Sequence, residues 1–254
     1  MSAQELLEDH SHPGSHCSTW PAQVRWKAGK QLLGVETLVV GMGEGASLFV
    51  QQCLGLRSAD VEWVGMLQLP EANAMDCGSR GFSLDPLDVS SGTCHMFLKG
   101  STLAVLCTYA VPQHAAHGWS AALLGCVQPK VVTAFTGLLA ADLCEVRTLL
   151  TSAAEQAPEC RESTQKLPRL PPGMLLSGAP AALVSQCQLS HIPAFTYVAA
   201  CGHSILGDAQ GVASVLEGAL DSLLELPCGK EVVRSGVSEG NQEVGGLPVS
   251  SIFM

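Results

Sequence analysis

Short apolar runs alternate with helix-length segments along most of this chain. Uncharged apolar runs, often β-branched, are typical of strands buried on both faces. Such runs occur at residues 37–41, 63–69, 131–136, 174–177 and 194–200. Two further runs, at residues 94–98 and 103–109, flank Lys99-Gly100-Ser101 and predict a hairpin.

Helices are expected between these strands. Apolar composition and spacing predict them at residues 46–54, 115–124, 179–189 and 212–226. The last segment has the clearest period, with apolar residues at i, i+3 and i+4. These are Val212, Val215, Leu216, Ala219, Leu220, Leu223 and Leu224. Strands alternating with helices predict an α/β fold: a single domain with a largely parallel central sheet and helices on both faces.

Polar segments frame the predicted domain. Residues 1–30 are polar and mixed, so we expect a flexible N-terminal arm before an α/β domain at residues 31–227. Within the domain, residues 151–172 hold four prolines and predict a surface loop. Residues 228–254 are rich in Gly, Ser and Glu and predict a flexible C-terminal tail.

Charged residues make up only 14% of the 254 residues, while 47% are hydrophobic. This composition excludes extended disorder and solvent-exposed helical rods. The net charge of −10 is opposite in sign to that of a typical nucleic-acid binder. Residues 100–129 and 170–207 carry no charge at all. Prolines, glutamines and histidines interrupt both runs, so neither predicts a membrane span.

The expected location is the cytoplasm, because the polar start of the sequence lacks the apolar segment of a secretory signal. Nuclear and endoplasmic-reticulum-associated pools stay open. The 11 cysteines are odd in number and form no CxxC pair. Several lie in apolar segments, so we expect mostly structural, reduced thiols in a reducing compartment.

A glycine-rich stretch, Gly41-Met42-Gly43-Glu44-Gly45, follows the first predicted strand and precedes a helix. This position suits a phosphate-binding turn. The spacing departs from GxGxxG, and Glu44 brings a negative charge to the place an anion would occupy. Nucleotide binding and a tight strand-to-helix connection therefore both remain open.

The sequence offers no positive case for an enzyme. Gly202-His203-Ser204 is similar to a nucleophile elbow, but the second glycine of GxSxG is displaced and no histidine follows position 203. The histidines form no zinc-ligand set, and no pair of carboxylates can be nominated from spacing. We therefore predict no catalytic residue, no cofactor and no metal site.

Two features point to partners instead. Glu217, Asp221 and Glu225 repeat at i, i+4 and i+8 opposite the apolar face of the last predicted helix. They form either a solvated helix face or a surface for a basic partner. Ile252, Phe253 and Met254 place an apolar tip on a polar tail, which is either an ordinary end of the sequence or an anchor for a groove.

A family resemblance favours the partner interpretation. Residues 178–198, GAPAALVSQCQLSHIPAFTYV, resemble a helix and strand of the proteasome assembly chaperone 1 family, including its Cys-Gln pair and Ile-Pro-Ala. Residues 38–49, LVVGMGEGASLF, resemble that family's first strand, glycine turn and helix. The similarity covers about residues 35–226, and the segments occur in the same order.

The resemblance implies a chaperone of 20S proteasome α-ring assembly that forms a heterodimer with proteasome assembly chaperone 2. Members carry a C-terminal hydrophobic-Tyr-any motif that enters pockets between α-subunits. Ile252, Phe253 and Met254 match its three positions, with Phe in place of Tyr. Part of the two charge-free runs is then expected to be apolar surface for a partner. The alternatives are a small-molecule enzyme or nucleotide-binding protein on the same fold, or a subunit of another complex.

Overall fold

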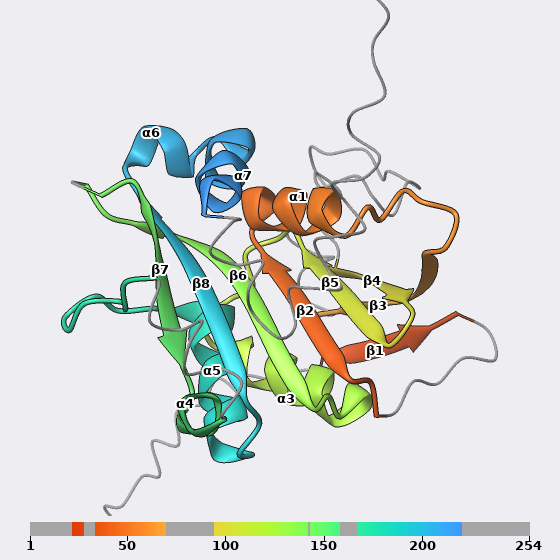
Figure 1. The fold of residues 1–254 in the computed structure, drawn as a ribbon. Helices are drawn as coiled ribbons and strands as arrows, with labels where there is room; N and C mark the ends of the chain where they lie inside the picture. Colours follow the sequence, from red (N-terminus) through yellow and green to blue (C-terminus); the bar gives the residue numbers. More distant parts are fainter. Residues whose placement is uncertain (1–21, 28–33, 70–93, 142, 158–166, 220–254) are drawn as a thin grey trace, which may run out of the picture.

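The computed structural model describes residues 22–27, 34–69, 94–141, 143–157 and 167–219. They form an eight-stranded mixed sheet with helices on both faces (Figure 1). The strands are β1 (Gln23–Trp26), β2 (Thr37–Met42), β3 (Glu62–Gln68), β4 (Cys94–Lys99), β5 (Thr102–Cys107), β6 (Val131–Leu139), β7 (Glu145–Leu150) and β8 (Ala194–Cys201). The helices are α1 (Glu44–Cys53), α3 (Ala116–Val127), α4 (Ser152–Gln156), α5 (Gly178–Leu189), α6 (His203–Leu206) and α7 (Ala209–Gly218).

The strand order is β1-β3-β4-β5-β2-β6-β8-β7. Only the four strands β5, β2, β6 and β8 run parallel to one another. β4, β3 and β1 extend the sheet antiparallel on one side, and β7 closes it antiparallel on the other. The sheet is therefore mixed, and the expectation of a largely parallel sheet is wrong. The α/β class and the helices on both faces are confirmed.

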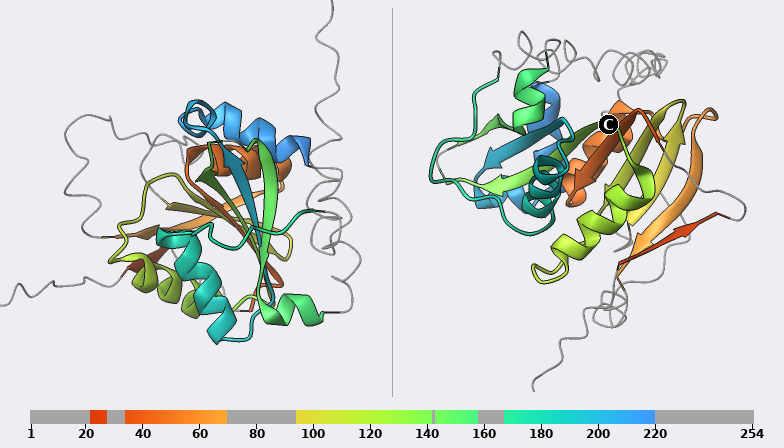
Figure 2. Two further views of the ribbon diagram at one scale, coloured as in Figure 1. Left: turned by 90° about the vertical axis from the view of Figure 1, so that its left-hand side faces the viewer. Right: turned by 90° about the horizontal axis from the view of Figure 1, so that it is seen from below.

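Alternation along β2 explains the two layers. Leu38, Val40 and Met42 point into a core beneath α3 and α5, whereas Val39 joins a second core beneath α1 and α7. All eight residues of β8 are buried, as expected for a strand covered on both faces. Figure 2 shows α3 and α5 side by side on the face opposite α1 and α7.

Several segments differ from the sequence predictions. Gln23–Trp26, expected in the flexible arm, pairs with β3 as strand β1. Glu145–Leu150 forms β7, which the sequence analysis missed, and Ser152–Gln156 forms α4 at the start of the predicted loop. Residues 174–177 form no strand and lead into the start of α5. The remaining domain boundaries stay predictions.

The other predicted elements are confirmed within a few residues. α7 begins three residues early because the Asp208 carboxylate accepts hydrogen bonds from the backbone N–H groups of Gln210 and Gly211, each at 3.1 Å. The predicted end of this helix at residue 226 lies outside the described residues. The predicted hairpin forms between β4 and β5, and Gly100 has the positive φ of 58° that its tight turn requires.

Candidate functional site

The glycine stretch after β2 is a tight connection between β2 and α1. A Cβ on Gly41 would lie 2.8 Å from the carbonyl oxygen of Ala46, and one on Gly45 would lie 2.5 Å from Cβ of Val212. Gly43 has φ of 90°, and its N–H donates to the carbonyl of Cys107 at 2.8 Å. Each glycine thus has a packing or conformational reason, and the Gly43 N–H is already engaged.

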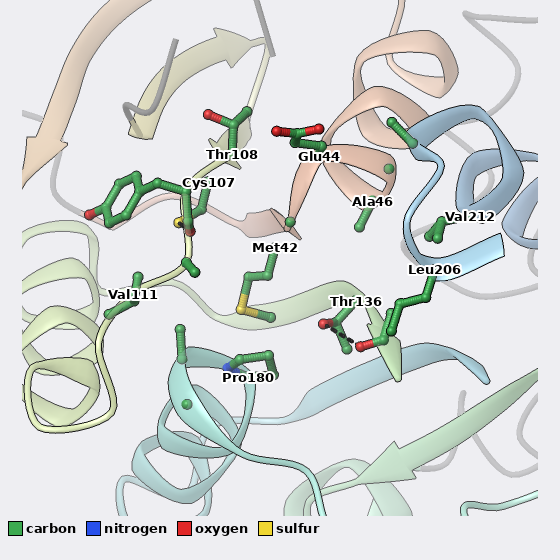
Figure 3. Close-up of a pocket in the computed structure, with 18 of the residues that line it drawn as sticks. Met42, Glu44, Ala46, Cys107, Thr108, Val111, Thr136, Pro180, Leu206 and Val212 are labelled. Carbon is green, nitrogen blue, oxygen red and sulfur yellow. Dashed lines mark hydrogen bonds between the residues drawn. The ribbon is translucent and has the colours of Figure 1, made fainter. Parts of the chain in front are cut away.

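A cavity of about 510 Å³ nevertheless opens beside this turn, at the carboxyl ends of β5, β2 and β6 (Figure 3). β2 leads into α1 on one face of the sheet, and β5 leads into α3 on the other. Such switch points are where open α/β sheets hold ligands. The start of α5 and the α6–α7 connection complete its walls.

The chemistry of this cavity does not suit a nucleotide. Its lining is mostly apolar, with Met42, Val111 and Leu206 among the side chains, and it includes the hydroxyls of Thr108 and Thr136. Glu44 is the charged side chain among the described residues that line it, and no Lys or Arg is among them. Phosphates would lie near this carboxylate, in a cavity whose described lining offers no Lys or Arg to bind them.

The thiols of Cys53, Cys94 and Cys187 and the phenol of Tyr109 have raised pKa values and remain protonated at neutral pH. Burial raises the pKa of Cys94 and of Tyr109 well above their usual values. Burial also raises the pKa of Cys187 to about 12. For Cys53 the pKa rises to about 12, chiefly through burial and secondarily through the nearby Glu217 carboxylate. Because a nucleophilic cysteine needs a lowered pKa, these thiols are structural.

Two further observations bear on the class of protein. Within the described ranges, no group of three or more His, Cys, Asp or Glu side chains is arranged to hold a metal ion. The same ranges contain no helix that is both long and apolar enough to cross a membrane.

The structure describes one of the six residues that the sequence nominated for partners. Glu217 is exposed near the end of α7. Asp221 and Glu225 lie outside the described residues, and so do Ile252, Phe253 and Met254. The acidic helix face and the anchoring tip therefore stay predictions.

A surface that the sequence analysis did not locate lies along α5. A groove of about 350 Å³ runs between residues 170–176 and the outer side of α5, with Ala181 and Val184 in its wall. Leu175, which lines the groove, is 83% exposed, and Leu189, the last residue of α5, is 76% exposed. Its signal in the sequence was the absence of charge from 170 to 207.

Comparison with solved structures finds proteins of similar fold. PbaA from Pyrococcus furiosus, described as an archaeal homolog of proteasome-assembly chaperone, matches with a TM-score of 0.54 at 14% identity, over 80% of this chain and 82% of its own. PbaB from the same organism, described as an archaeal proteasome activator, matches with a TM-score of 0.56 at 13% identity, over 85% of this chain and 95% of its own.

The chain has the fold of these archaeal proteins. A Thermoplasma acidophilum protein of unknown function shares it too, with a TM-score of 0.53 at 12% identity over 79% of this chain and 82% of that one. No protein-family model matches the chain, and no curated sequence does. The expected resemblance is thus confirmed as a likeness of fold to archaeal proteasome-assembly chaperone homologues, at low identity.

Proposed function

We propose that the protein is a non-enzymatic chaperone subunit that promotes assembly of the 20S proteasome α-ring, as a heterodimer with proteasome assembly chaperone 2. The observation that carries this proposal is the fold shared with an archaeal homolog of proteasome-assembly chaperone. The sequence resemblance supports it independently, since the resembling residues 178–198 form α5, its turn and β8.

The turn between α5 and β8 is the most distinctive part of that resemblance. Ile192 donates its N–H to the carbonyl of Cys187, and the carbonyl of Pro193 accepts from the N–H of Val132 in β6, both at 2.9 Å. The N–H of Ala194 donates to Oγ1 of Thr151, also at 2.9 Å. These hydrogen bonds of the backbone at residues 192–194 fix how α5 passes into the sheet.

The proposed mechanism is templating, without bond chemistry. The body binds a second chaperone through apolar surface, and residues 252–254 anchor the pair to the α-ring. Ile252 and Phe253 bury apolar area, and Met254 carries the captured carboxylate. Phe in place of Tyr omits a hydroxyl hydrogen bond that contributes about 0.5–1.5 kcal/mol.

Affinity purification tests the proposal. The tagged full chain, expressed in cells, should retain proteasome α-subunits and proteasome assembly chaperone 2, identified by mass spectrometry. Deletion of residues 252–254 should weaken α-subunit capture while leaving the chaperone heterodimer intact, and Phe253→Tyr should strengthen capture. Unchanged α-subunit capture by the deletion variant would refute the role of the tail.

The acidic helix face is the second proposed contact with the α-ring. Glu217, Asp221 and Glu225 would meet basic α-subunit surface, and no Lys or Arg occurs between Arg169 and Lys230 to oppose them. Replacing all three by Lys should reduce α-subunit capture, most at low salt. If α-subunit capture by this variant is unchanged at low salt, the acidic face is an ordinary solvated surface with no role in binding.

Small-molecule binding is the alternative function, and the cavity at the carboxyl ends of β5, β2 and β6 is the observation that favours it. A thermal-shift screen against nucleotides and phosphorylated metabolites separates the two. A clear shift with one ligand, together with no α-subunits in the purification, would favour an enzyme or binding protein.

A further inference from the structure

The outer side of α5, which faces away from the sheet, carries no charged side chain. Ala182, Leu183 and Cys187 of this helix point into the core and are buried. Ala181, Val184 and Ser185, on the other side, line the groove opposite residues 170–176. We call residues 170–176 with Ala181, Val184 and Leu189 the α5 face.

Exposed leucines mark this face. Leu175 and Leu189 are 83% and 76% exposed, and among the described residues Leu139 is the other large hydrophobic side chain above a third, at 43%. The groove of about 350 Å³ that Leu175 lines is more than twice the roughly 150 Å³ cavity that accepts a benzene ring. A protruding leucine next to a groove that can accept apolar side chains is a feature of an interface core.

The face carries no charge, which restricts what can cover it. Residues 170–207 contain no Asp, Glu, Lys or Arg, and the flanking Arg169 is paired with Glu155. A charged side chain buried against this groove would lose its hydration without gaining a counter-ion. The complementary surface is therefore uncharged.

This requirement distinguishes the two partners of the proposed function. The contacts proposed for α-subunits are the acidic residues Glu217, Asp221 and Glu225 and the tail at residues 252–254. Among them, Glu217 in α7 lies within the described part of the chain. α7 packs on the core beneath α1, whereas α5 packs on the opposite core (Figure 1). A protein covering the α5 face thus leaves α7 open, so both partners can bind at once.

We propose that the α5 face is the surface on which the second assembly chaperone docks, through an uncharged apolar surface of its own. This inference rests on the proposed function and names the heterodimer face within it. Leu175 and Leu189 are the residues on which the contact depends most, because they protrude and lose the most water-exposed apolar area on binding.

The test compares heterodimer affinity across full-length variants. Leu175→Asp/Leu189→Asp places two charges on the face, and Leu139→Asp places one at the end of β6 as a matched control. Leu175→Ser/Leu189→Ser removes apolar area without adding charge. Circular dichroism and thermal unfolding establish that each variant is folded, and biolayer interferometry measures its Kd for purified proteasome assembly chaperone 2.

The double Asp variant should bind the second chaperone at least tenfold more weakly, the double Ser variant should show a smaller loss, and Leu139→Asp should stay within twofold of the parent. A parental Kd in the folded double Asp variant overturns the α5 face while leaving the proposed function standing. Self-association of the parent that the double variant loses, with an unchanged heterodimer, assigns the face to a second copy and also overturns the inference. If the parent captures neither the second chaperone nor α-subunits, the proposed function itself fails.

Discussion

Thr151 joins three elements through one hydroxyl. Its Oγ1 accepts from the backbone N–H of Ala194 at 2.9 Å and of Ala154 at 3.4 Å, and it donates to the carbonyl of Ile192 at 3.1 Å. The residue follows β7, caps α4 and fixes the start of β8, and it is 1% exposed. The family-like turn before β8 therefore depends on a residue distant in sequence.

Replacing Thr151 by Val should destabilise the protein by about 2–3 kcal/mol, since it removes the helix cap and leaves a buried N–H unpaired. Thr151→Ser keeps the hydroxyl and should lose less than half of that. Urea unfolding followed by circular dichroism measures both. Equal midpoints for the Val and Ser variants would show that the hydroxyl contributes nothing.

Cysteine reactivity should separate by burial. Burial raises the pKa of Cys53 and of Cys187 to about 12, so at pH 8 roughly one thiol in ten thousand is ionised at each. Cys144 is exposed. Iodoacetamide at pH 8, with peptide mapping, should label Cys144 before Cys187 and leave Cys187 unlabelled until the protein unfolds. Similar rates at Cys144 and Cys187 would contradict the assignment of Cys187 to the core.

At the scale of elements, α1 and α7 pack at a distance that Gly45 sets. A Cβ there would approach Cβ of Val212 to 2.5 Å and the carbonyl oxygen of Ala209 to 2.7 Å. Since one of these atoms is backbone, a side-chain rotation cannot relieve the contact. The glycines after β2 thus belong to helix packing, which supports the tight-connection interpretation of this stretch.

Gly45→Ala should therefore destabilise the protein by about 1–3 kcal/mol despite the better helix propensity of Ala. Gly125→Ala is the matched control, because Gly125 lies in α3 with nothing within 4 Å of its added Cβ. That variant should be stabilised by up to about 0.5–1 kcal/mol. Thermal unfolding of the Gly45→Ala and Gly125→Ala variants measures these changes in stability. A Gly45→Ala variant as stable as the parent would contradict the close contact between α1 and α7.

Elements with uniform apolar character were predictable from the sequence, and edge elements were not. β2 and β8 are buried on both faces, so their composition alone identifies them. β7 carries Glu145 and Arg147 near the edge of the sheet, and the short β1 alternates exposed with half-buried residues. Such edge strands resemble polar loops in composition. A strand buried on both faces has the same apolar composition whether its neighbours run parallel or antiparallel. The sequence therefore overestimated the share of parallel strand pairs in the sheet.

At the scale of the whole molecule, the absence of charged residues from 100–129 and 170–207 has two physical causes. Much of these two runs forms strands such as β5 and β8, whose residues are all buried. The α5 face accounts for another part, because the exposed polar residues of α5, Ser185 and Gln188, are uncharged. The sequence therefore predicted apolar partner surface but not its position, because that depends on how residues 170–176 fold against α5.

The central claim is a role in α-ring assembly, and the yield of complete rings tests it most directly. Recombinant α-subunits are assembled with and without the heterodimer of this protein and proteasome assembly chaperone 2, and native mass spectrometry counts complete rings and off-pathway species. We expect more complete rings and fewer off-pathway species when the heterodimer is present. An identical distribution of species with and without it, at concentrations where the heterodimer forms, would contradict the account.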